Sequence, residues 1–188
     1  MVRDDIILAS ASPRRIVMFR EKGYDPRVHP AKIDESLPFA MSPETAVMYL
    51  SFAKASHVAE QQKGLIIAAD TIVVYDGEII GKPRDEEEAF RILSELRGRE
   101  HQVITGVCLI DNAQEPPVKQ CLYDVTDVYF GDYSDEELRA YVQTPEPYDK
   151  AGGYAIQETF GKYIDHIEGD MDNVIGFPMY RVEEFLRC

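Results

Sequence analysis

The segment that most constrains the fold is "GLIIAADTIVVYDGEIIG" at residues 64–81, the most apolar stretch of the chain. Its first part predicts a buried strand, and Asp76-Gly77 predicts a tight turn into a second, short strand. Other short apolar runs alternate along the chain with helical patterns, which indicates an α/β fold. We therefore expect a mixed, elongated sheet with helices on its faces.

Four helix starts carry an N-cap residue followed by proline or, three positions on, by glutamate: Ser12, Ser42, Asp85 and Ser134. The first helix is expected to end at Gly23, the second near Gln62 and the third at Gly98. A last helix is expected from about Met179. These signals predict where helices lie, but not how they pack.

The remaining segments are expected to be extended or looped. Residues 101–111 and 119–130 predict an antiparallel pair joined by a polar loop, and residues 24–34 look extended. The tail at 148–178 mixes glycine-rich loops with one or two strands. Because no stretch has the composition of a linker, we expect a single domain over residues 1–188.

The charge of the chain excludes two classes of partner. The net charge of −14 argues against non-specific binding to nucleic acid or to a membrane surface. Such a protein can still bind an anion, but only through a local basic cluster. Each group of lysines and arginines is therefore a candidate anion site.

The cysteines and histidines give no sign of a zinc site. Cys108, Cys121 and Cys188 lack CxxC spacing, and the four histidines lack HxxxH spacing, so we expect free thiols in a reducing compartment. The N-terminus lacks the pattern of a signal peptide, and no apolar run approaches a membrane span. The chain is expected to be cytoplasmic.

The stretch "LASASPRR" at residues 8–15 is a candidate phosphate site. A strand that runs into a helix N-terminus leaves backbone N–H groups free to bind an anion. Ser10 adds a hydroxyl there, and Arg14 and Arg15 add guanidinium groups suited to phosphate. The alternative is that Ser12 only caps the helix and both arginines lie in solvent.

Asp70, in "AADTIVV", is the candidate for chemistry. It follows an apolar run that continues beyond it, so it should lie within the sheet and need a cation or a metal as partner. It could serve as a general base, a metal ligand or a nucleophile, or it could be structural. Lys54 and Lys82 are candidate cations, and Glu35 is a candidate metal carboxylate.

The segment "DKAGGYAIQETFG" at residues 149–161 contains two adjacent glycines, which imply positive φ or close backbone approach. Lys150 and Gln157 flank them with polar reach. An amide can recognise a base or a ribose, although a turn with an exposed glutamine is the simpler interpretation.

Together these motifs resemble the Maf family of nucleoside triphosphate pyrophosphatases, once linked to septum formation. The resemblance is carried in order by "LASASPRR", "DES" at 34–36, "AKA" at 53–55, "AADTIV", "GKP" at 81–83, "HQVITGV" at 101–107, "DKAGGYAIQ" and "VIGFP" at 174–178. The variant "DKAGGYAIQ" looks like the branch acting on dTTP and UTP rather than the branch acting on 7-methyl-GTP.

The resemblance implies a Maf/ITPase-like fold with a central substrate cleft, often in a homodimer. It implies hydrolysis between the α- and β-phosphates with a divalent cation, Mg²⁺ or Mn²⁺, and with Asp70 as proton acceptor. It implies substrate contacts or specificity roles for Ser10, Arg14, Arg15, Lys54, Thr71, Lys82 and Gln157, and metal binding by Glu35 and Asp70.

The chain also departs from the family pattern near the expected base-reading residues. Ala155 and Glu158 stand where the branch commonly has glycine, and Gly131 stands where arginine is usual. One alternative is thus a nucleotide-binding regulator of cell division with little turnover. Another is a nucleotidyl- or glycosyl-transferase, which the absence of a DxD pair at Asp70 disfavours.

Overall fold

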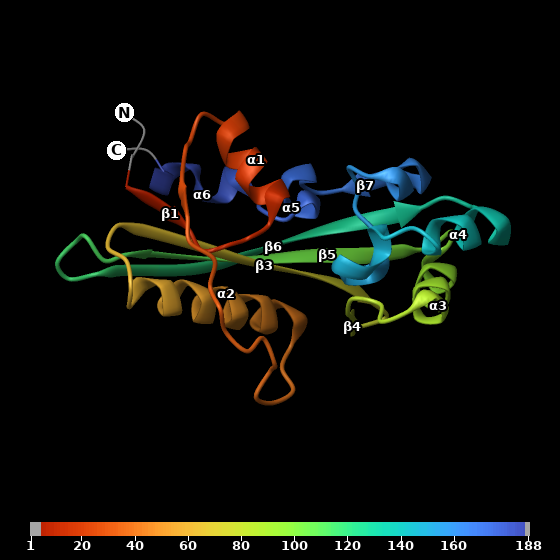
Figure 1. The fold of residues 1–188 in the computed structure, drawn as a ribbon, viewed down its shortest axis with the longest axis horizontal. Helices are drawn as coiled ribbons and strands as arrows, with labels where there is room; N and C mark the ends of the chain where they lie inside the picture. Colours follow the sequence, from red (N-terminus) through yellow and green to blue (C-terminus); the bar gives the residue numbers. More distant parts are fainter. Residues whose placement is uncertain (1–4, 187–188) are drawn as a thin grey trace. The chain divides into compact units, whose positions relative to one another are not determined.

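The computed structural model describes residues 5–186, which form a mixed α/β fold with a seven-stranded sheet and flanking helices (Figure 1). Cys188, expected to be a free thiol, lies outside the described residues. Cys108 and Cys121 are free, as expected. The α/β class predicted from the alternating pattern is confirmed.

The sheet has the hydrogen-bonded order β2-β1-β3-β5-β6-β7, with β4 paired to β3. Strand β1 runs parallel to both of its neighbours, β2 and β3. The pairs β3–β4 and β6–β7 are antiparallel, so the sheet is mixed. The strands are β1 (Ile6–Leu8), β2 (Arg27–Val28), β3 (Leu65–Tyr75), β4 (Glu78–Ile80), β5 (Glu100–Asp111), β6 (Val118–Phe130) and β7 (Ile164–Glu168).

Two tight connections follow the sequence signals. Asp76 and Gly77 both have positive φ, 49° and 79°, which gives the turn between β3 and β4 the backbone twist of a two-residue hairpin. β5 and β6 are neighbours joined by residues 112–117. That connection is too short for a crossover between parallel strands, so this pair is antiparallel.

The helices are α1 (Pro13–Glu21), α2 (Pro43–Ala59), α3 (Glu86–Leu96), α4 (Asp135–Val142), α5 (Met171–Ile175) and α6 (Met179–Leu186). The second helix ends at Ala59 rather than near Gln62. Helix α5 was not predicted, nor were three short 3₁₀ turns at Glu146–Asp149, Ala151–Gly153 and Thr159–Tyr163. These elements span only one turn or so, too few residues for a helical periodicity to develop in the sequence.

The caps explain where the helices begin. The side chains of Ser42, Asp85 and Ser134 each accept a hydrogen bond from the backbone N–H three residues on, and Ser134 forms a complete capping box with Glu137. The box expected at Asp85 is half formed, because the carboxylate of Glu88 accepts from the backbone and guanidinium of Arg84 instead. Ser12 occupies the N-cap position, but its side chain makes no capping hydrogen bond.

The chain divides into two compact units, each with its own core. Unit 1 comprises the described parts of Met1–Asp70, Thr105–Asp124 and Gly176–Cys188, and unit 2 comprises Thr71–Ile104 and Val125–Ile175. In unit 1, helix α2 packs on the sheet through a cluster of small and branched side chains: Ile7, Ala9, Ala55, Val58, Ile66, Ala68, Cys108 and Ile110. In unit 2, the core gathers α3, α4 and an aromatic group that includes Phe130, Tyr133, Tyr154 and Phe160.

Gly106 on β5 explains how α2 comes so close to the sheet. A Cβ atom at this position would lie 2.5 Å from the backbone carbonyl carbon of Val47 in α2. Only glycine fits there, and α2 is the helix that carries Lys54.

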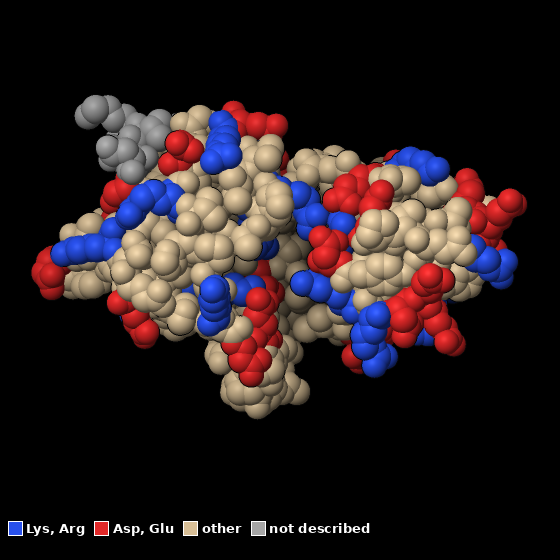
Figure 2. Space-filling view, viewed as in Figure 1, with Lys and Arg blue, Asp and Glu red and all other residues tan. Residues whose placement is uncertain are grey.

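The surface is mixed in charge. On the face shown in Figure 2, lysine and arginine side chains lie singly or in small groups among aspartates and glutamates. Within residues 5–186, no helix combines the length and the apolarity needed to cross a membrane.

Candidate active site

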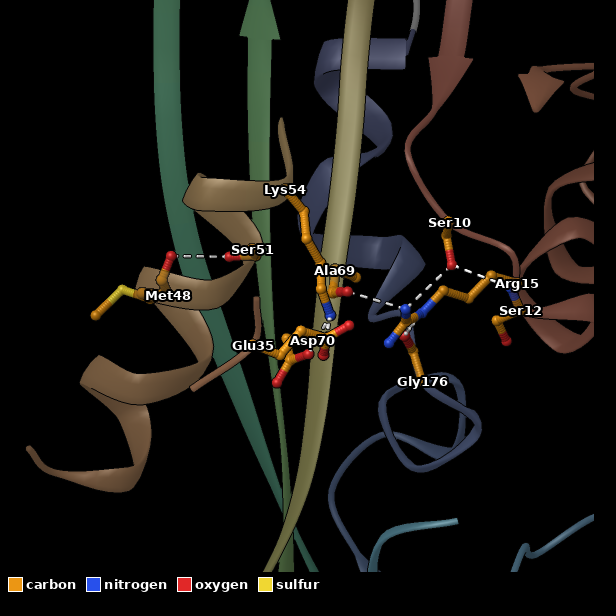
Figure 3. A network of polar contacts seen from close by, with 10 residues as sticks. All are labelled: Ser10, Ser12, Arg15, Glu35, Met48, Ser51, Lys54, Ala69, Asp70 and Gly176. Atoms are coloured by element: carbon orange, nitrogen blue, oxygen red, sulfur yellow. Dashed lines mark hydrogen bonds and ion pairs between the residues drawn. The ribbon is translucent and has the colours of Figure 1, made fainter. Parts of the chain in front are cut away.

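Asp70 lies inside β3, between Ala69 and Thr71, and is 8% exposed. Its Oδ1 accepts a hydrogen bond of 2.6 Å from the ammonium of Lys54 on α2 (Figure 3). A buried carboxylate without such a partner would be costly, because desolvation disfavours its charge. The sheet setting expected for Asp70 is confirmed, and the partner that its burial requires is Lys54.

Lys54 holds a second carboxylate as well. Its Nζ lies 2.8 Å from Oε2 of Glu35, whose side chain is 57% exposed, while the side chain of Lys54 is only 11% exposed. Lys54 lies between Ala53 and Ala55 on α2, and its charged end reaches Asp70 and Glu35 together. One cation therefore sets the spacing of two carboxylates.

Arg15, in the first turn of α1, ties three separate segments together. Its Nε donates to the carbonyl of Gly176 (2.8 Å), and its Nη1 donates to the carbonyl of Ala69 (2.9 Å) and to Oγ of Ser10 (3.2 Å). Burial lowers the pKa of Arg15, and the nearby charge of Asp70 acts in the opposite direction. The guanidinium thus lies close to the catalytic candidate and stays charged at neutral pH.

Ser10 and Arg14 complete the group at the start of α1. The hydroxyl of the buried Ser10 accepts from the backbone N–H of Ser12 at 3.2 Å. Arg14 is half-buried, and its charge acts on Arg15 to lower the pKa of that guanidinium. Unit 1 therefore brings together Ser10, Arg14, Arg15, Glu35, Lys54 and Asp70.

The remaining candidates belong to unit 2. Thr71 is the next residue of β3, half-buried, whereas Lys82 and Gln157 are exposed on the segments after β4 and after the second 3₁₀ turn. These two segments are tied to each other, because the backbone N–H of Gly152 donates to the carbonyl of Gly81 at 3.1 Å.

The residues present can contribute to a divalent-cation site only in part. Among residues 5–186, no group of three or more histidine, cysteine, aspartate or glutamate side chains could hold a metal by itself. Glu35 and Asp70 nevertheless offer two carboxylates on one lysine, and Mg²⁺ is commonly bound by one or two carboxylates completed by substrate phosphates and water. The donor set fits a metal that arrives with a phosphate ligand.

Two partners of Arg15 could not be predicted from the sequence. They are the backbone carbonyls of Ala69 and Gly176, and a carbonyl acceptor carries no residue-type signal. The motif "VIGFP" contains Gly176, but only the folded chain reveals which carbonyl meets the arginine.

Fold and site together define an α/β protein in which a carboxylate buried in a strand is held by a helix lysine next to an arginine-bearing helix start. The chain matches the Maf-like protein family over residues 5–188 and belongs to the Maf family.

Curated relatives align with nearly the whole chain. It is 42% identical over 187 residues to a dTTP/UTP pyrophosphatase from Caldicellulosiruptor bescii, covering 97% of this chain and 93% of that protein. It is 43% identical over 187 residues to a dTTP/UTP pyrophosphatase from Dictyoglomus turgidum, covering 98% and 96%. Among solved structures, the Staphylococcus aureus Ham1 protein aligns with 68% of this chain and 72% of its own, with 19% identity and a TM-score of 0.46.

Proposed function

We propose that this protein is a nucleoside triphosphate pyrophosphatase that hydrolyses dTTP and UTP to the monophosphate and pyrophosphate. The observation that carries the proposal is the setting of Asp70, buried in β3 and held by Lys54 beside Arg15. The names of the Maf relatives, which align with nearly the full chain, support the same reaction and the same two substrates.

Asp70 acts as the proton acceptor in this proposal. Its Oδ1 is bonded to Lys54, which orients the carboxylate and leaves Oδ2 to take a proton from water. The water oxygen forms a bond to phosphorus, the bridging oxygen between the α- and β-phosphates leaves with pyrophosphate, and the proton passes to Asp70. General-base help of this kind contributes about 10²–10⁴-fold, and charge stabilisation contributes further.

The cations of the site neutralise the triphosphate. Arg14 and Arg15 lie at the start of α1, where backbone N–H groups also favour an anion. Lys82 and Thr71 are also proposed to contact the substrate, and Gln157 to contact its base or ribose. Glu35 and Asp70 would hold a Mg²⁺ or Mn²⁺ ion, which would supply further stabilisation of phosphate charge.

A nucleotide panel tests this function. Purified protein is incubated with canonical and modified nucleoside triphosphates and Mg²⁺ or Mn²⁺, and monophosphate and pyrophosphate are quantified. We expect turnover of dTTP and UTP that EDTA abolishes and added metal restores. Tight nucleotide binding without turnover would instead favour the regulatory alternative, and products of group transfer would favour a transferase.

Five expectations remain predictions from the sequence. They are the cytoplasmic location, the absence of a nucleic-acid partner, the homodimer, the central cleft and the single domain over residues 1–188.

A further inference from the structure

Lys150 does not act as the free cation that its place beside the glycines suggested. Its side chain is 6% exposed, and its Nζ lies 2.6 Å from Oδ1 of Asp149, 2.6 Å from the carbonyl of Glu146 and 2.9 Å from Oε2 of Glu158. An ammonium has three N–H donors, and here three acceptors surround it. Lys150 is therefore committed to the protein and does not offer its charge to a phosphate.

Glu158 brings this buried cation into contact with the far side of the loop. Glu158 follows Gln157 directly. Its ion pair with Lys150 therefore joins the two ends of the loop formed by residues 150–158. Its carboxylate is one-third exposed, and its partner is almost fully buried. A pair held in this way is less screened by water than one on the open surface.

Thr159 makes a second closure next to the first. Its Oγ1 lies 2.6 Å from Oε1 of Glu146, and its backbone N–H donates to Oε2 of the same carboxylate at 3.3 Å. Glu146 thus binds both ends of the segment, with its carbonyl on Lys150 and its carboxylate on Thr159. We call these contacts among Glu146, Lys150, Glu158 and Thr159 the loop clasp.

The rest of the loop is packed as well. A Cβ on Gly152 would lie 2.9 Å from the side chain of Val73, and a Cβ on Gly161 would lie 2.0 Å from the carbonyl oxygen of Ile156. The buried Tyr154 is hydrogen-bonded to His101. Gln157 is the exception, because it is exposed and its side-chain amide has no hydrogen-bond partner among residues 5–186.

We propose that Glu158 is a positioning residue: through the loop clasp, it fixes the backbone that presents the amide of Gln157 to the nucleotide. This inference rests on the proposed function for its ligand, but the clasp itself exists without one. It also gives a role to Glu158, one of the residues that departs from the family pattern.

The first test asks whether the clasp orders the loop, with no nucleotide present. Hydrogen exchange is followed in peptides covering residues 150–161 for the wild type, Glu158→Ala, Glu158→Gln and the control Glu87→Gln, which changes an exposed glutamate in the first turn of α3. We expect faster exchange in Glu158→Ala, an intermediate rate in Glu158→Gln and the wild-type rate in the control. Unchanged exchange in Glu158→Ala overturns the clasp, whether or not the protein is an enzyme.

The second test asks whether Glu158 acts through Gln157. The dissociation constant of α,β-methylene-UTP, which resists cleavage of the proposed bond, is measured for Glu158→Ala, Gln157→Ala and the double variant. Loss of a hydrogen bond to the ligand corresponds to about 5- to 10-fold weaker binding. We expect each single variant to weaken binding by about that factor, and the double variant to bind no more weakly than Gln157→Ala alone.

Multiplied effects in the double variant, or wild-type affinity in Glu158→Ala, overturn the positioning role. So does a wild-type protein that does not bind the analogue. Binding of the analogue by a protein that turns over no triphosphate contradicts the proposed function alone, because the affinities still decide the role of Glu158. For an active enzyme, Glu158→Ala is expected to raise KM for UTP more than it lowers kcat.

Discussion

At the scale of single residues, Lys54 is the cation that balances the two carboxylates of the candidate site. Its ammonium lies between Asp70 and Glu35, at 2.6 and 2.8 Å. Without it, the negative charges of the two carboxylates would have no cation between them to offset their repulsion. The requirement for a partner could be predicted from the burial of Asp70, but its identity could not, because Lys54 lies 16 residues away on another element.

Replacing Lys54 with methionine keeps most of the apolar stem and removes the charge. We expect kcat for UTP to fall by about 100-fold or more, because Asp70 loses the contact that orients it. Steady-state kinetics measures the effect, with Lys63→Met as the control, which changes an exposed lysine in the connection between α2 and β3. Wild-type kcat in Lys54→Met would show that the ion pair has no part in turnover.

His101 provides a prediction about pH. Burial disfavours the charged form of the imidazole and lowers the pKa of His101 to about 4. The unfolded chain, with a histidine pKa near 6.5, takes up the proton first as the pH falls. The stability that the neutral ring contributes is complete above about pH 6.5 and is lost toward pH 4, by about 3 kcal/mol at most.

Urea unfolding at pH 7 and pH 4.5 for the wild type and His101→Phe isolates this contribution. The carboxylates titrate in both proteins, so only the difference between them reports on His101. We expect the free energy of unfolding to fall more steeply in the wild type. Equal losses would mean that His101 is not held neutral by its surroundings.

At the scale of elements, helix positions could be predicted better than the contacts at their ends. Proline and cap residues located the starts of α1, α2, α3 and α4, since these signals are local in sequence. The side chain of Ser12 does not cap α1, and the backbone N–H of Ser12 donates to Ser10 instead. The hydroxyl of Ser10 therefore accepts two hydrogen bonds at the candidate site, one from the backbone of Ser12 and one from Arg15.

A pair of serine substitutions tests this difference. Ser134→Ala removes a complete capping box from α4 and should lower the free energy of unfolding by about 1 kcal/mol. Ser12→Ala removes a side chain that makes no capping hydrogen bond and should change stability by less than about 0.5 kcal/mol. Both are measured by urea denaturation, and equal losses would contradict the assignment of the caps.

At the scale of the whole molecule, the division into two units had no signal in the sequence. β3, β5 and β6 each contribute residues to both units, so three of the four boundaries fall inside strands, and the fourth lies between Ile175, the last residue of α5, and Gly176. The Maf family match runs across both units. The candidate residues are divided in the same way, with the Asp70 cluster in unit 1 and Lys82 and Gln157 in unit 2.

The central claim is that Asp70, held by Lys54, takes the proton during hydrolysis of a nucleoside triphosphate. The most direct measurement is the rate of pyrophosphate and monophosphate release from UTP and dTTP by Asp70→Asn, which keeps the shape of the side chain and removes its basicity. We predict a kcat lower by about 10²–10⁴-fold, with a urea unfolding transition that shows a folded protein. An Asp70→Asn protein with the turnover of the wild type would contradict the account.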